Sequence, residues 1–318
     1  MRGTHAFPLW ATLAALGVGL LAAVQSRVNG SLAEALGNGL EAAAISFTIG
    51  FLSLTVALGL LPRMREGLRR LRGEVRERGI ARWQLFGGVL GAFFVLTQTL
   101  SVPVGGVALF AVTTVSGQTV ASLIVDRVGL GPMGRQAWTA GRVLSAGIAV
   151  AGVACAVAGR WGGESLSLLL VVMGLAAGGA IAVQQAINGR VSAASGEPLV
   201  AAWVSFLTGT IALLVAAGIA VLAGASDLSP PPGTDLWLYS GGVLGAVFIA
   251  TAAWVVGRVG VLRLALLSIA GQLVGAIAFD LAFTDYVDVG LIVGVALAFT
   301  AVAVNGLGRR VRPGMMNA

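Results

Sequence analysis

The chain contains an internal repeat. Residues 23–50 align with residues 182–209 without a gap at an offset of 159, and 13 of the 28 positions are identical. A second block, residues 87–126, matches residues 241–280 at an offset of 154, and both copies of it begin with GGVLGA. Both blocks lie in very apolar sequence, so two homologous halves share a membrane core. Membrane repeats of this kind usually place a transport pathway at their interface.

The composition excludes an ordinary water-soluble domain. Hydrophobic residues make up 57% of the chain and charged residues 10%, against about 25% charged residues in soluble domains; the mean hydropathy is +0.94. With one cysteine, Cys155, and one histidine, His5, neither a disulfide framework nor a cysteine-based metal site is expected, and we predict no cofactor. The chain has no lysine, which excludes a Walker A nucleotide site.

Ten apolar stretches are long enough to cross a bilayer as helices. In the first half they are 8–28, 41–61, 83–101, 105–125 and 137–159, and in the second half they are 166–187, 198–223, 237–257, 261–281 and 289–308. A signal peptide is an alternative for the first stretch. The internal copy of that stretch at 173–188 argues against this alternative, because no signal peptide lies inside a chain.

Arginines predict the orientation, because cytoplasmic loops are enriched in them. The loop 62–82 holds eight arginines, and placing it in the cytoplasm puts both termini there too. Eighteen of the 20 arginines then lie inside, and only Arg27 and Arg160 lie outside. The net charge of +7 therefore reflects topology, and no nucleic-acid partner is expected. The loop itself is predicted to be a short basic amphipathic helix, either solvated or touching anionic lipid.

Five spans per half is an odd number, so the second half enters the membrane upside down. The loop after the second span is rich in arginine, whereas its counterpart at 224–236 has none. We therefore predict an all-α integral membrane protein with ten transmembrane helices, built from two inverted five-helix repeats over residues 1–160 and 161–318.

Polar side chains at membrane depth are costly, which makes repeated ones candidates for function. Gln25 and Asn29 recur as Gln184 and Asn188, and each pair lies on one helix face. The Asn-Gly that follows in both copies predicts a helix end or break. With that boundary, inversion places Gln25 near the outer surface and Gln184 near the inner one. We therefore expect these four residues at two separate gates or vestibules, or in interhelical hydrogen bonds and helix caps.

A second repeated pair lies near the middle of its spans. Gln118 and Gln272 each follow a glycine, and inversion brings them to a similar depth from opposite directions. This geometry predicts a shared central site, with hydroxyls at Thr114 and Ser268 and a further amide at Gln98. The alternative is that these amides only join helices. Asp126 and Asp280 lie at span ends, and we expect Asp126 to pair locally with Arg127 at the membrane surface; proton coupling is the alternative.

The pattern G-x-x-x-A-x-Q-x-x-x-N-G followed by A-A-x-x-S-F-x-x-G runs from Gly19 to Gly50 and again from Gly178 to Gly209. In this pattern each half resembles the YdcZ-type proteins of the drug/metabolite transporter superfamily. The resemblance implies ten helices in two inverted units of the transporter (EamA-like) fold, in the inner membrane. Related small multidrug resistance proteins use a glutamate on their first helix for proton exchange. This chain has none in the ranges 8–28 or 166–187, which argues against that mechanism.

We therefore predict a secondary transporter, an exporter of a small metabolite or drug-like solute working by alternating access. Its partners would be the solute and the bilayer. The sequence is also compatible with a homo-oligomer. A channel or a non-transporting membrane partner is the alternative. A membrane-embedded transferase is a third possibility, but such chemistry needs clustered carboxylates, histidines or a metal site, and no acidic pair recurs within the spans. The protein is thus not expected to be an enzyme.

Overall fold

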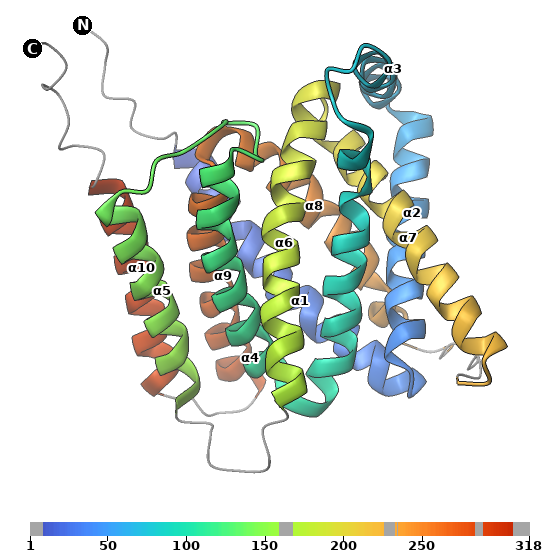
Figure 1. Cartoon of the computed structure of the whole chain (residues 1–318). Helices are drawn as coiled ribbons and strands as arrows, with labels where there is room; N and C mark the ends of the chain where they lie inside the picture. The colour runs from blue at the N-terminus through green and yellow to red at the C-terminus, as the bar shows by residue number, and fades with distance from the viewer. Residues whose placement is uncertain (1–8, 159–167, 226–232, 234, 284–288, 308–318) are drawn as a thin grey trace, which may run out of the picture.

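The structure is a computed structural model that describes residues 9–158, 168–225, 233, 235–283 and 289–307, and in these residues it contains helices and turns but no strand. Most helices stand side by side as an upright bundle (Figure 1). The α-helices are α1 (Leu9–Leu36), α2 (Gly39–Leu60), α3 (Pro62–Arg76), α4 (Gly87–Val128), α5 (Ala140–Ala158), α6 (Leu168–Ser195), α7 (Pro198–Leu222), α8 (Ser240–Val259), α9 (Val261–Phe283) and α10 (Val289–Leu307). Short 3₁₀ turns, η1 (Arg82–Phe86) and η2 (Leu236–Tyr239), precede α4 and α8.

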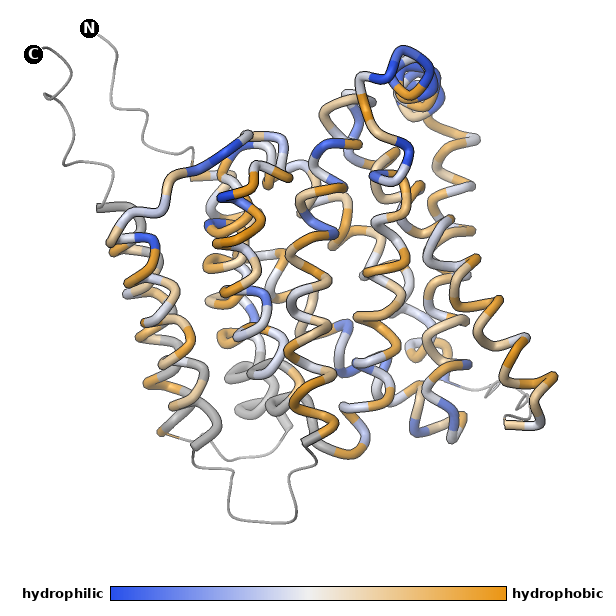
Figure 2. The backbone as a smooth tube through the Cα atoms, in the orientation of Figure 1, coloured by the Kyte–Doolittle hydropathy of each residue, from blue (hydrophilic) through white to orange (hydrophobic). Residues whose placement is uncertain are grey.

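The outer surface of the bundle suits lipid. Within the described residues, six segments are long and apolar enough to cross a membrane: Leu9–Leu36, Gly39–Leu60, Arg82–Val104, Leu169–Ser195, Pro198–Leu222 and Leu236–Val259. Apolar colour dominates the upright helices in Figure 2, whereas polar colour gathers at α3. Large apolar side chains such as Val56 (61% exposed) and Ile219 (62%) point outward, which water would penalise and hydrocarbon favours.

The turns that connect α1 to α2 and α6 to α7 are equivalent in the two copies. A glycine with a positive φ ends the first helix in each case, Gly37 at 65° and Gly196 at 66°, a conformation that glycine adopts without a Cβ clash. The next residue caps the second helix. The Asn38 side chain accepts from the N–H groups of the first turn of α2 at 3.1 Å, and Glu197 accepts from that of α7 at 3.3 Å. In both copies, the glycine and the capping residue after it explain why one helix ends and the next begins here.

Helix α1 runs away from the end of the bundle that carries α3, and α6 runs toward that end (Figure 1). Both helices are longer than expected, because the Asn-Gly sequence does not end them. A methyl group on Gly30 would lie 2.6 Å from the Val102 side chain, and one on Gly189 would lie 2.4 Å from Val256. These glycines serve close helix packing within a continuous helix, and the predicted break is wrong.

Helix α4 is 42 residues long and contains Pro103. In a straight helix, residues 94 and 110 would lie about 24 Å apart at 1.5 Å per residue. The rings of Phe94 and Phe110 are instead 5.3 Å apart, so α4 folds back on itself near the proline, which lacks an N–H and kinks helices. Its two legs occupy the ranges where two spans, 83–101 and 105–125, were expected. In the second copy the same corner is a break at Gly260, whose φ is 83°.

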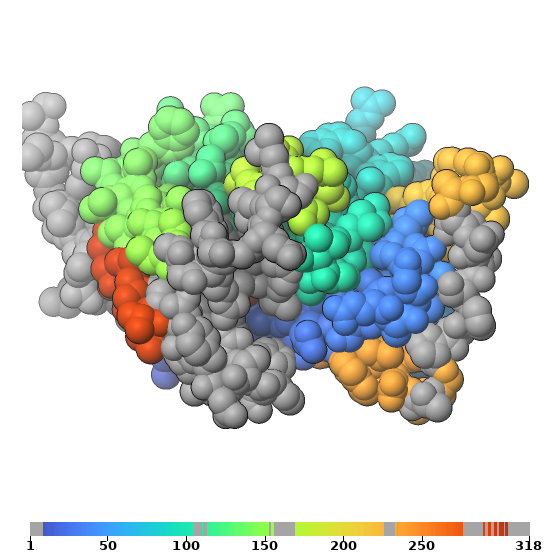
Figure 3. All heavy atoms as spheres, turned by 90° about the horizontal axis from the view of Figure 1, so that it is seen from below, coloured from blue at the N-terminus to red at the C-terminus, as the bar shows by residue number. Residues whose placement is uncertain are grey.

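The two ends of the bundle differ. Helix α3 lies across one end and is seen almost along its axis in Figure 1, with the α4–α5 and α8–α9 connections at the same end. The opposite end, viewed in Figure 3, brings the α1–α2 turn against the bend of α4. There the Thr99 hydroxyl donates to the Gly39 carbonyl oxygen at 2.7 Å, which ties the turn to the first leg of α4.

Candidate functional site

A small cavity lies inside the bundle, and residues from both copies line it. About 10 Å³ of it is open to the centre of a water molecule, which is room for about one water. The lining residues are Gln25, Phe47, Gly91, Phe94, Val95, Ile181, Gln184, Phe206, Gly245, Phe248 and Ile249. Ten of these eleven form five equivalent pairs: two pairs are separated by the offset of 159 and three by the offset of 154. The cavity therefore lies where the two copies face each other.

Two buried amides are the polar groups of this cavity. The Gln25 Nε2 donates to the carbonyl oxygen of Gly241 on α8 at 3.3 Å. The Gln184 Nε2 donates to the hydroxyl of Ser205 on α7 at 3.0 Å. Each amide side chain is at most 4% exposed. Amides donate and accept hydrogen bonds without carrying charge, so the cavity can bind a polar group of a solute without a counter-ion.

Two glycines of the repeated GGVLGA block make room for these amides. A methyl group on Gly91 would lie 2.1 Å from the Gln184 Nε2, and one on Gly245 would lie 2.5 Å from the Gln25 Nε2. Any larger residue would push the amide out of its place. This role was not predicted from the sequence, although the identity of the block in both copies is a signal for it.

Aromatic rings form the remaining walls. The rings of Phe47 on α2 and Phe206 on α7 are 4.8 Å apart and tilted by 36°. Phe94 on α4 and Phe248 on α8 complete the set. These residues were not predicted from the sequence either, although each phenylalanine is identical in the two copies. Aromatic faces bind planar apolar groups and delocalised cations.

The position of Gln25 and Gln184 corrects the expectation that they are separated. Each is the seventeenth residue of a 28-residue helix, because α1 and α6 continue beyond the Asn-Gly. Both amides therefore lie in the middle of the bundle and line one cavity. Their assignment to opposite vestibules, which relied on shorter helices, does not fit this geometry.

Asn29 and Asn188 hold helices together. The Asn29 Nδ2 donates to the Oε1 of Gln98 at 2.7 Å, and the Gln98 Nε2 donates to the Ser26 hydroxyl at 2.7 Å. Ser46 donates to the Asn29 Oδ1 at 3.0 Å. In the second copy, Asn188 donates to Ser205 at 3.3 Å, and the position of Gln98 is occupied by alanine. Gln98, a predicted binding residue, thus has partners at both ends of its amide.

Gln118 and Gln272 do not line the cavity. The Gln118 Nε2 donates to the Oε1 of Gln185 on α6 at 3.2 Å. The Gln272 Oε1 is buried and has no hydrogen-bond partner in the described part of the chain. No hydrogen bond joins these two glutamines within the described residues. Their neighbours Thr114 and Ser268 donate to backbone oxygens, at 2.6 Å to Phe110 and 3.5 Å to Ala15.

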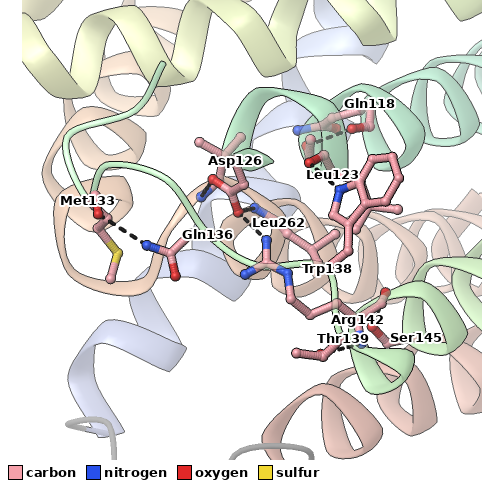
Figure 4. A network of polar contacts seen from close by, with 12 residues as sticks. Gln118, Leu123, Asp126, Met133, Gln136, Trp138, Thr139, Arg142, Ser145 and Leu262 are labelled. Carbon is pink, nitrogen blue, oxygen red and sulfur yellow. Dashed lines mark hydrogen bonds and ion pairs between the residues drawn. The ribbon is translucent and has the colours of Figure 1, made fainter. Parts of the chain in front are cut away.

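Asp126 forms a clasp between three helices at the end of the bundle that carries α3 (Figure 4). Its carboxylate accepts from the N–H groups of Val261 and Leu262, at 3.3 and 3.2 Å, and thereby caps α9. Arg142 on α5 donates to the same carboxylate at 2.5 Å. The predicted local pair with Arg127 is wrong. The side chain of Asp280 lies outside the described residues.

No group of three or more histidine, cysteine or acidic residues that could hold a metal occurs in the ranges the structure describes. The described site is therefore a neutral, partly aromatic cavity between two copies of one helical unit. A cavity between two internal repeats of a helical membrane bundle is typical of membrane transport proteins.

Comparison with known proteins agrees with this class. The model of the family described as "Putative inner membrane exporter, YdcZ" matches residues 10–155 and 169–304, one match in each copy. The chain belongs to this YdcZ family of the drug/metabolite transporter superfamily, as its sequence motifs predicted. It is a membrane protein of an inner-membrane exporter family.

A solved structure titled "Crystal structure of protein" has the same fold. It superposes with a TM-score of 0.64 at 20% sequence identity, and the match covers 96% of this chain and 98% of that chain. This likeness concerns the fold alone. A search of curated proteins finds no match.

Proposed function

We propose that the protein is a secondary transporter that exports a small metabolite or drug-like solute by alternating access. The observation that carries this proposal is the cavity lined by five pairs of equivalent residues from the two copies. A site between inverted copies can open to one side through one copy and to the other side through its counterpart. The cavity has room for about one water molecule, so the described conformation corresponds to a closed state.

The proposed architecture has ten spans in two inverted five-helix units, residues 1–160 and 161–318. The first unit would comprise α1, α2, the two legs of α4 and α5, and the second α6 to α10. Two observations support it: the opposite directions of α1 and α6 (Figure 1), and contacts that recur at the offsets of 159 and 154. By the excess of arginine we place the end that carries α3, and both termini, in the cytoplasm.

The lining suggests the class of solute. Four phenylalanine rings and two amides face the cavity, and no charged residue lines it. Such a site favours a neutral solute or a delocalised cation with a planar apolar part and one or two hydrogen-bonding groups. Under this proposal, Gln25 and Gln184 exchange their present bonds to Gly241 and Ser205 for bonds to the solute.

Replacing both cavity amides tests the proposal. A thermal-shift screen of the purified protein first identifies a stabilising solute, and its flux is then measured in proteoliposomes. We expect Gln25→Ala combined with Gln184→Ala to lower the flux at least about tenfold, which corresponds to about 1.4 kcal/mol. Saturable flux would also separate a carrier from a channel.

The matched control replaces Gln118 and Gln272, the pair predicted from sequence to bind the solute. Gln118→Ala combined with Gln272→Ala removes two amides of the same kind that lie outside the cavity. We expect this double variant to change the flux by less than about threefold, under 1 kcal/mol. If this second pair abolishes flux and the first pair leaves it intact, the site lies at Gln118 and Gln272 and the cavity assignment is wrong.

The glycines beside the amides give an independent prediction. In Gly91→Ala, the added methyl meets the end of a flexible side chain, the Gln184 amide at 2.1 Å, so the amide moves while the fold persists. A displacement of about 1 Å in a binding group costs up to about 100-fold in function. We expect flux to fall roughly tenfold or more with the melting temperature nearly unchanged. The equivalent Gly245→Ala should act alike, and normal flux in both variants would contradict the role of the amides.

A further inference from the structure

A groove lies between α2 and α3, away from the cavity. It has a volume of about 440 Å³, within the range of about 300–1,000 Å³ that is typical of ligand sites. Seven residues line it, four from α2 or the apolar side of α3 and three arginines: Thr55, Leu58, Gly59, Leu68, Arg65, Arg69 and Arg72. Helix α3 lies across the end of the bundle (Figure 1), so the groove sits where a membrane-spanning helix meets the membrane surface.

Five of the six arginines of α3 fall into two groups, and Arg76 at the end of the helix belongs to neither. Those of the first group hold the helix on the bundle: Arg63 lies 3.5 Å from the Glu197 carboxylate, and Arg70 donates to the Ser195 carbonyl oxygen at 2.9 Å. Met64, Gly67 and Leu71 form the buried face of the helix. The arginines of the second group, which line the groove, take no part in this attachment.

The arginines of the groove are exposed and lie on one helical face, at spacings of four and three residues. Arg69 pairs with Glu66. The hydrogen bond from Arg69 and its positive charge lower the pKa of Glu66, so this carboxylate stays ionised at neutral pH. Arg65 and Arg72 have no ion pair within the described residues. The groove thus retains two uncompensated positive charges that can bind an anionic group.

Below these charges the groove continues into an apolar stripe. Leu52, Val56 and Leu60 on α2 are 55%, 61% and 74% exposed, and their spacing of four residues places them on one face. Thr55 and Gly59 of the groove follow Leu52 by three and seven residues and so share that face. On one side the Trp203 Nε1 donates to the Thr55 hydroxyl at 3.1 Å. Positive charge above an exposed apolar stripe complements a phosphate that carries acyl chains.

We propose that this groove binds an anionic phospholipid. Its phosphate contacts Arg65 and Arg72, with Arg69 beside them, and an acyl chain lies along Leu52, Val56 and Leu60. A phospholipid with no net charge gains less from these arginines, because a positive headgroup offsets its phosphate. The bound lipid holds α3 at the membrane surface.

Lipid retention measures this site directly. The full-chain protein is purified, equilibrated with phosphatidylglycerol or phosphatidylcholine, and examined by native mass spectrometry. We expect the wild type to retain phosphatidylglycerol preferentially. Arg65→Gln, Arg69→Gln and Arg72→Gln together should weaken its retention at least about tenfold, because the basic side chains attract anionic lipid. The control removes three exposed charges outside the groove: Arg76→Gln, Arg78→Gln and Arg82→Gln. We expect this control variant to change the retention of phosphatidylglycerol by less than about threefold. Equal losses in both triple variants would overturn the proposal.

A second variant keeps all the arginines. A methyl group on Gly59 meets no atom within 4 Å, so Gly59→Leu fills the groove without a clash and should preserve folding, because leucine is the better helix former. We expect it to lose bound phosphatidylglycerol as well. Glycerol 1-phosphate serves as the probe without acyl chains. If it competes as strongly as the intact lipid, or if Gly59→Leu retains the lipid like the wild type, the groove is not a phospholipid site.

Discussion

Replacing Gly19 or Gly178 by alanine is expected to destabilise the protein by about 3 kcal/mol or more, because each glycine lies where two helix backbones touch. A methyl group on Gly19 would lie 1.8 Å from the Ser268 carbonyl oxygen on α9. A methyl group on Gly178 would lie 1.8 Å from the Thr114 carbonyl oxygen on α4. Backbone atoms cannot move aside as a side-chain end can, so the helices must separate. Thermal unfolding in detergent micelles or nanodiscs measures the loss.

The control lies on the same helix. A methyl group on Gly17 would meet no atom within 4 Å, so Gly17→Ala should leave the melting temperature unchanged or raise it, since alanine is favoured over glycine in a helix by about 1 kcal/mol. Equal melting temperatures for Gly17→Ala and Gly19→Ala would show that α1 and α9 do not cross as closely as the structure indicates.

The same glycines show how far sequence could predict the packing. Spacings of the GxxxG type occur at Gly87/Gly91, Gly174/Gly178, Gly241/Gly245 and Gly290/Gly294, and the high glycine content makes each of them weak evidence alone. The repeat supplies the missing information. Gly19 and Gly178 are separated by 159, and their contacts at Ser268 and Thr114 are separated by 154. The same glycine contact therefore occurs once in each copy, at positions related by the two offsets, and this reflects the internal symmetry of the fold.

The helical membrane architecture and the family were predictable because they depend on length, apolarity and motif, which a sequence displays directly. The direction in which each amide side chain points could not be predicted from the sequence. Neighbouring residues on a helix point about 100° apart, so Gln184 lines the cavity while Gln185 faces Gln118 on α4. In a soluble helix the apolar stripe sets this rotation. Helix α6 has apolar residues on every side along its first four turns, so no stripe sets its rotation and packing decides which amide points inward.

Helix boundaries were the second source of error. The Asn-Gly sequence predicts an end in water, where glycine interiors are weak. Inside this bundle, Gly30 and Gly189 gain packing against Val102 and Val256, and hydrocarbon penalises a broken backbone. The helices therefore continue, which moves Gln25 and Gln184 from the predicted membrane surfaces to the middle of the bundle. One wrong boundary in each copy is therefore enough to change which pair of glutamines lines the cavity.

Replacing Asp126 by alanine is expected to cost about 3–5 kcal/mol, because it leaves the Arg142 guanidinium without its counter-ion in a mostly buried place. The side chains of Arg142 and Asp126 are 17% and 5% exposed. The substitution also removes the cap of α9, whose first two N–H groups donate to this carboxylate, and a lost cap contributes about 1 kcal/mol. Asp126→Asn keeps an acceptor for the cap and loses the charge, so its cost should be intermediate.

A double-mutant cycle with Arg142→Ala separates the ion pair from the cap. Once Arg142 is absent, Asp126→Ala should cost only the cap, about 1 kcal/mol, and the difference between the two costs is the coupling of the pair. Arg127→Ala is the matched control, because sequence alone predicted Arg127 as the partner, whereas the structure leaves it exposed at the end of α4. We expect a change within about 0.5 kcal/mol for this control. If Arg127→Ala costs as much as Asp126→Ala, the ion pair lies within α4, and Asp126 does not join α4, α5 and α9.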